Sequence, residues 1–209
     1  VDLLVSDLQT DRPRLEQQVP VLLKQLVDSG QIMAVDTEFR LQTREGVRWT
    51  TDFNRRRIAA LNDDQRLNSK RADLLREGTK QALKPVLLQQ GTSGTLRKLI
   101  TELTSSRPSS SGDEITLWVR DGWSDDEKSV LNDARAAGVD SPLLYGYLPR
   151  LHHEDLRQAI ASQIAAQETL DSHGPAATPE AIEARKAIET QLEVAQHHIR
   201  DLLGQIIGG

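Results

Sequence analysis

Four carboxylates gather just after one apolar segment, and they are the first residues whose types and spacing could do chemistry. Residues 115–119 have the β-branched and aromatic composition of a strand, and the acids lie between Asp121 and Glu127. Ligands of parallel α/β sheets collect beyond the carboxyl ends of the strands, so a metal or phosphate site is one interpretation. In the other, Asp121 and Gly122 turn the chain and the later acids favour the amino end of a helix. We favour the second, because no paired base or nucleophile accompanies the acids.

Two histidine pairs, at 152–153 and 197–198, are the candidates for zinc. Adjacent side chains of a helix point about 100° apart, whereas zinc ligands on a helix need spacings of three or four residues. The chain also has no cysteine to complete such a site. A hydrolase triad has no support either, since the Gly-x-Ser-x-Gly motif is missing. We therefore expect no catalytic residue, no metal and no cofactor in this chain.

Cations in the middle of the chain are the serious candidates, and their chemistry would be nucleic-acid binding. Residues 1–37 hold three basic and six acidic side chains, residues 38–100 hold fourteen and seven, and residues 101–209 hold nine and eighteen. Cations contact phosphates, while arginine and glutamine also read base edges. The possible DNA-contacting residues are Arg12, Arg14, Gln17, Lys24, Arg40, Arg44, Arg48, Arg55 and Arg56. Direct DNA contact and a packing or partner role both stay open for this segment.

The elements that must position these cations begin with a winged-helix-like segment, residues 1–48. Apolar spacing predicts a short helix over 3–8 and a longer one from residue 11, with Gly30 as its left-handed carboxyl-terminal cap. The alternation over 32–41, with Asp36 and Thr37 at its midpoint, predicts a two-stranded hairpin. Helix, helix and hairpin are typical of a winged helix that lacks its usual first helix.

Residues 49–91 are expected to form a long basic helical arm. Apolar side chains recur there every seven residues, at Phe53, Ala60, Leu67 and Leu74. A single narrow stripe on a charged helix predicts packing along one seam, against this chain or a partner. Trp49 is expected to anchor the arm to the wing.

The remaining residues predict a small α/β unit over 92–150 and an antiparallel helical hairpin over 151–209. Strands near 115–120 and 143–148 flank a helix that Ser124 and Glu127 open as a capping box, which makes a short parallel βαβ sheet. Thr178 and Pro179 predict the start of the last helix. We therefore expect a mainly α fold with a small α/β unit.

Composition agrees with this fold and also bears on the cellular location of the chain. Aromatic residues make up 3% and charged residues 27% of the chain, which favours helices over a β-sandwich. The lack of cysteine fits a reducing cytoplasm, and no apolar run approaches the roughly 20 residues of a membrane span. We expect a cytoplasmic chain with no membrane contact, and its abrupt start at Val1 predicts a piece of a larger protein.

Three blocks carry a resemblance to a known family: 41–46 with Trp49, 118–123 continuing through 133–142, and 168–171 continuing through 178–185. They resemble BrxC/PglY, the large P-loop ATPases of bacterial BREX phage-exclusion systems. The resemblance implies ATP-dependent antiviral defence on DNA with other BREX proteins, with ATP and Mg²⁺ in the full-length protein, which could be an oligomer. This chain lacks Gly-x-x-x-x-Gly-Lys-Ser/Thr, so we expect no nucleotide site within it.

Together these observations predict a non-catalytic segment that couples the ATPase motor to DNA or to other defence proteins. The alternative is an autonomous DNA-binding module that uses the wing and the basic arm. A third and weaker hypothesis is an unrecognised enzyme centred on Asp121.

Overall fold

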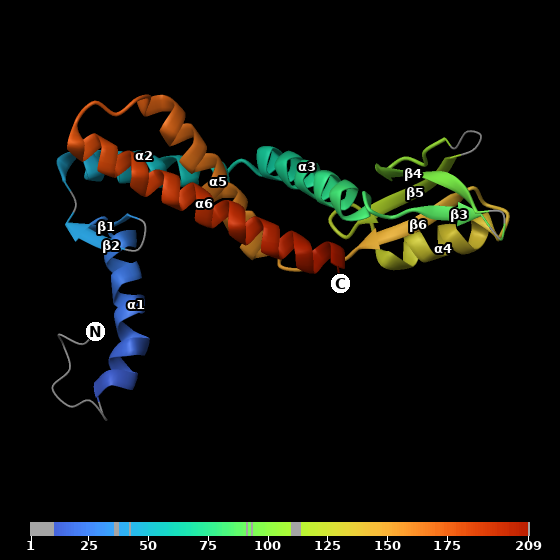
Figure 1. Cartoon of the computed structure of the whole chain (residues 1–209), viewed down its shortest axis with the longest axis horizontal. Helices are drawn as coiled ribbons and strands as arrows, with labels where there is room; N and C mark the ends of the chain where they lie inside the picture. The colour runs from blue at the N-terminus through green and yellow to red at the C-terminus, as the bar shows by residue number, and fades with distance from the viewer. Residues whose placement is uncertain are drawn as a thin grey trace. The chain divides into compact units, whose positions relative to one another are not determined.

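The computed structural model describes residues 11–35, 38–41, 43–90, 92, 94–109 and 114–208. They form a mainly helical protein with a small mixed sheet, which confirms the predicted fold class at this level (Figure 1). In chain order the elements are α1 (Asp11–Asp28), β1 (Ile32–Val35), β2 (Glu38–Leu41), α2 (Arg44–Leu61), α3 (Asp64–Leu83), β3 (Leu88–Gln90), β4 (Thr95–Leu103), β5 (Glu114–Asp121), α4 (Glu127–Ala137), β6 (Leu143–Leu148), α5 (His153–His173) and α6 (Pro179–Gly208). None of the described helices is both long and apolar enough to cross a membrane.

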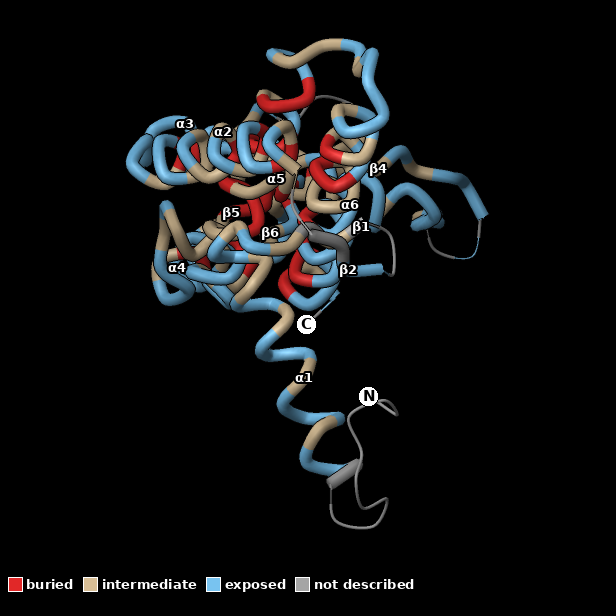
Figure 2. Tube along the Cα trace, turned by 90° about the vertical axis from the view of Figure 1, so that its left-hand side faces the viewer, coloured by how far each residue is buried: buried red, intermediate tan, exposed pale blue. Residues whose placement is uncertain are grey.

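The chain divides into two compact units. The first comprises Val1–Asp64 and Ala159–His197, and the second comprises Gln65–Gln158 and His198–Gly209. Helices α5 and α6 therefore contribute residues to both units. Each unit has its own buried residues, and the tube in Figure 2 is red where a residue is buried.

The core of the first unit is built by α2, α5 and α6. Its buried cluster consists of Trp49, Phe53, Ala165, Ala166, Leu170, Ala184 and Ile188, with Leu192 packed against it. The alanines of α5 and α6 are almost fully buried, and their small side chains let the helices approach closely. Thr43 accepts a hydrogen bond from the Gly46 amide at the start of α2. At the start of α6, the Thr178 hydroxyl accepts a hydrogen bond from the Ala181 amide, which confirms the predicted cap.

Helix α1 and the strand pair β1–β2 also belong to the first unit. Gly30 ends α1 with φ 72°, as predicted, because its amide bonds back to Val27 and that of Gln31 to Leu26. β1 and β2 pair antiparallel, so the expected hairpin strands are present. The midpoint of the expected hairpin, at 36–37, and the helix expected over 3–8 lie outside the described residues. From 13 to 28, no side chain of α1 is buried.

The prediction of a single long helical arm is wrong, because α2 ends at Leu61 and α3 begins at Asp64. Asparagine and aspartate at 62 and 63 bond readily to nearby backbone and so favour helix ends over helix interiors. The predicted seven-residue seam spans this break. As a result Leu74 is only partly buried, whereas Leu75 has an exposed fraction of 0%.

The sheet of the second unit has the order β3-β4-β5-β6. β3 pairs antiparallel with β4, while β4, β5 and β6 run parallel. Helix α4 connects β5 to β6 and packs against β6, so the predicted parallel strand–helix–strand connection is present. The start of α4 differs from the expected capping box: Asp126 is the cap, and its carboxylate accepts the Ser129 amide. Asp126 can do this because it directly precedes the first helical residue.

Candidate functional site

Three of the predicted DNA-contacting arginines share one exposed face of α2. Arg44, Arg48 and Arg55 lie within about 40° of one another on a helix of about 3.6 residues per turn. They span about 16 Å of its length. The side chains of Arg48 and Arg55 are 73% and 72% exposed. The outward cations of α2 therefore lie opposite the face that buries Trp49 and Phe53.

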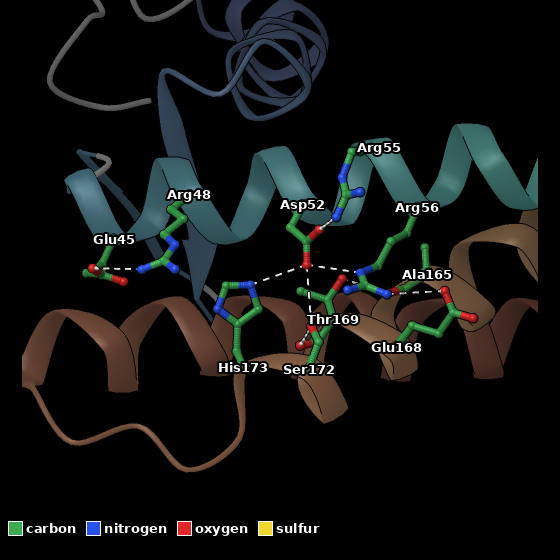
Figure 3. Close-up of polar contacts among 10 residues, drawn as sticks. All are labelled: Glu45, Arg48, Asp52, Arg55, Arg56, Ala165, Glu168, Thr169, Ser172 and His173. Carbon is green, nitrogen blue, oxygen red and sulfur yellow. Dashed lines mark hydrogen bonds and ion pairs between the residues drawn. The ribbon is translucent and has the colours of Figure 1, made fainter.

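Asp52 lies beside this face and organises a polar network, the Asp52 network, drawn in Figure 3. Its carboxylate accepts hydrogen bonds from Arg55, from Arg56 at 2.9 Å and from the Ser172 hydroxyl at 3.4 Å. His173 Nε2 lies 3.3 Å from the same carboxylate. Because the Asp52 side chain is only 14% exposed, these contacts take the place of water.

The charge of Asp52 is strongly stabilised. Burial by itself would raise the pKa of its carboxyl, but the hydrogen bonds and charges of Arg55 and Arg56 lower that pKa to about 2. In return, the hydrogen bond to Asp52 raises the pKa of the Arg56 guanidinium. Asp52 is therefore ionised throughout the physiological range.

Arg56 carries the network from α2 to α5. Its Nη1 lies 3.6 Å from the Glu168 carboxylate, and its side chain is 24% exposed. At the end of α5, the His173 ring stacks on the Trp49 indole with centroids 4.2 Å apart. Trp49 thus packs on α5, a contact that the expected anchoring to the wing did not include. Two of the predicted DNA-contacting residues, Arg55 and Arg56, bind a carboxylate of their own chain.

The remaining predicted contact residues are spread along α1 and β2. Arg14 bonds Gln18 within α1 at 3.3 Å, and Gln17 and Lys24 are exposed. The side chains of Arg12 and Arg40 lie outside the described part of the chain. The cations whose side chains are described therefore concentrate on the outward face of α2.

Most of the acids after β5 have structural partners. The Asp121 carboxylate accepts the Trp123 amide at 2.9 Å, which turns the chain as expected. Asp125 lies 4.0 Å from the guanidinium of Arg120, a side chain that is only 6% exposed. Arg120 also forms an ion pair with Asp133 at 2.7 Å, although its guanidinium and the Asp133 carboxylate are not aligned for a hydrogen bond. Among the described residues, no group of three His, Asp or Glu side chains could hold a metal ion.

An aromatic cluster that the sequence did not reveal lies next to Asp121. Trp123 Nε1 donates a hydrogen bond to His153 Nδ1 at 2.8 Å, and the Arg71 guanidinium lies 4.9 Å from the Trp123 ring centre. Burial lowers the pKa of His153, and the charges of Arg150 and Arg71 lower it further. His153 is therefore held neutral, as an acceptor at Nδ1 must be. Trp123 and His153 are 30 residues apart in the chain, so no local spacing predicted the cluster.

Gly122 is the tightest point of this region. A Cβ built there would lie 2.7 Å from the Tyr147 hydroxyl and 2.8 Å from the Arg150 backbone nitrogen. Gly122→Ala should lower the free energy of unfolding by about 1 to 3 kcal/mol, the usual effect of overpacking. Gly204→Ala is the matched control, since a Cβ there meets nothing within 4 Å and α6 should gain about 0.5 to 1 kcal/mol.

Urea titrations of both glycine variants would measure these changes. An equal response in the two variants would contradict the close approach of β5 to residue 150.

Comparisons of the chain with protein-family models, with curated proteins and with solved structures find no match. Function is therefore inferred from the site itself, from the arrangement of its cations and from the partners that they contact.

Proposed function

We propose that this chain is a non-catalytic segment of a BREX-type antiviral ATPase, which couples the motor to DNA or to other defence proteins. The observation that carries the proposal is the Asp52 network. Arg56, at the centre of the basic region, joins α2 to α5 by contacting both Asp52 and Glu168, and Asp52 itself contacts Ser172 and His173 of α5. A segment whose cations bind its own helices suits force transmission better than a free DNA-binding arm.

The finer architecture belongs to the same proposal. We take α1 with the β1–β2 pair as the remnant of a winged helix, and α5 with α6 as an antiparallel hairpin. The half-exposed apolar side chains of α1, including Leu15, Val19 and Leu26, suit a surface that another protein covers. ATP and Mg²⁺ would be bound elsewhere in the full-length cytoplasmic protein, which could be an oligomer.

Autonomous DNA binding is the second candidate, and the outward face of α2 favours it. Arg44, Arg48 and Arg55 form a stripe of cations that would meet phosphates before base edges. Arg48 lies 4.0 Å from Glu45, a contact between exposed side chains that contributes little energy. Of the three, Arg44 and Arg48 can be changed without disturbing the Asp52 network.

Salt dependence separates the two candidates. Each phosphate that the protein neutralises adds about 0.9 to the log–log slope of affinity against salt. Under the coupling function, the isolated chain should bind duplex DNA weakly, with a slope below about 1, and Arg44→Ala/Arg48→Ala should leave the slope unchanged. Fluorescence anisotropy with two unrelated duplexes across a salt series would measure it.

The matched control is the double variant Lys128→Ala/Arg200→Ala, which removes two exposed cations outside the predicted DNA-contacting set. A slope near 3 in the parent that falls by about 2 in the α2 variant alone would overturn coupling through protein contacts. It would favour the DNA-binding module instead.

A further inference from the structure

A small cavity lies inside the first unit, beside the Asp52 network but separate from it. Its volume is about 70 Å³. The end of α1, β1, α2, α5 and α6 all contribute to its wall. Since a water molecule takes up about 30 Å³ in the liquid, the cavity can hold a group of a few heavy atoms but no nucleotide.

Arg57 gives this cavity a positive charge. It is the third of the consecutive arginines of α2, and it lines the cavity, whereas its neighbours Arg55 and Arg56 bind Asp52. Its Nε is buried and has no hydrogen-bond partner among the residues that the structure describes. An unsatisfied buried donor is costly, and more so on a charged group, so Arg57 is poised to bind an acceptor.

Neutral polar residues line the same cavity as Arg57. Asn54 and Gln191 carry amides that can donate hydrogen bonds, and the Ser162 hydroxyl can do so as well. Phe53 and Ile188 supply apolar wall on the side of the core. Such a combination binds a small ligand with one charged end and a short apolar end.

The charges of the residues that line the cavity favour one class of ligand. Among the described residues of the lining Arg57 is the single cation, and the exposed Asp28 adds a negative charge at the same cavity. Asp28 repels any anion, but it repels a doubly charged phosphate about twice as strongly as a singly charged group, and one guanidinium can match only one of the two phosphate charges. A carboxylate carries one charge, and its two oxygens fit the planar fork of arginine.

We propose that the Arg57 cavity is a binding site for a small carboxylate, either a free short-chain acid or the acidic side chain of a protein. Arg57 binds the carboxylate oxygens, and the amides of Asn54 and Gln191 complete its hydrogen bonds. The inference does not depend on the proposed coupling function, because the cavity is lined by none of the residues of the Asp52 network.

Acetate is the probe for the free acid, and a capped peptide with one glutamate is the probe for the side chain. In ¹⁵N-labelled parent protein, the Arg57 Nε–H resonance should shift saturably with at least one of the two probes. Sodium chloride at equal ionic strength should leave it unmoved. Saturation by acetate alone identifies a free acid, and saturation by the peptide identifies a protein side chain.

Thermal melting provides the second readout. The effective probe should raise the Tm of the parent and of Arg44→Gln, which lacks an exposed arginine of the same helix. It should leave the Tm of Arg57→Gln unchanged. If Arg57→Gln does not fold, the resonance of the parent decides alone. An Arg57 resonance that neither probe moves, or one that inorganic phosphate saturates at lower concentration, would overturn the proposal.

Discussion

Asp52→Ala should lower the free energy of unfolding by about 2 to 4 kcal/mol at neutral pH, near the range for removing one partner of a buried ion pair. The change leaves Arg56, whose side chain is only 24% exposed, without its closest carboxylate. It also removes one of the two acceptors of the Ser172 hydroxyl and the carboxylate beside His173. Chemical denaturation followed by circular dichroism would measure the loss.

Glu45→Ala is the matched control, because Glu45 pairs with an arginine of the same helix at 4.0 Å and both side chains are exposed. It should alter stability by at most about 0.5 kcal/mol. Equal losses in the two variants would show that the Asp52 network adds nothing beyond surface charge.

The pH dependence of stability gives an independent check on Asp52. Its pKa is about 2 in the folded protein against 3.8 for the free side chain. A lowered carboxyl pKa means that the unfolded state binds the proton first, so the contribution is complete above pH 3.8 and is lost as the pH falls towards 2. The parent should lose more stability over this interval than Asp52→Asn, by about 1 to 2 kcal/mol.

Leu75→Ala should destabilise the second unit by about 2 to 5 kcal/mol, the range for deleting a fully buried leucine side chain. Leu75 has an exposed fraction of 0%, and its helix α3 also buries Leu67 and Thr79. Leu74→Ala makes the same chemical change one residue earlier, where the side chain is only partly buried. It should cost less than about 1.5 kcal/mol.

Urea denaturation of the two leucine variants would decide which residue lies in the core. If Leu74→Ala proved the more damaging, one continuous helix with the seven-residue seam would describe the arm better than α2 and α3.

Local rules predicted those elements whose signals lie within a few residues. Gly30 ended α1 because its glycine backbone adopts positive φ readily. Thr178 before Pro179 marked the start of α6, because a hydroxyl cap and a fixed proline φ both suit a first turn. The strand at 114–121 followed from its apolar and β-branched composition, and the strand at 143–148 from its apolar and aromatic composition. Composition likewise favoured a mainly helical protein.

The pairing of charges across the chain was decided by tertiary structure. The positions of Asp52, Arg55 and Arg56 allow ion pairs within α2, but nothing local shows that Glu168 and His173 meet them. Such partners come together only when α2 packs against α5, over 100 residues later in the chain. This packing made Arg56, predicted to contact DNA, a group that binds another helix of its own chain.

The sequence likewise could not show that the buried Arg57 Nε lacks a hydrogen-bond partner among the described residues. Residues 55–57 are three identical side chains, and their spacing alone cannot tell which of them meets a carboxylate and which meets a cavity. Successive residues of a helix turn by about 100°, so each arginine faces a different environment. The sequence by itself determined the helices and their charge, while the packing of α2 against its neighbours decided that Arg57 faces a cavity and Arg44 faces solvent.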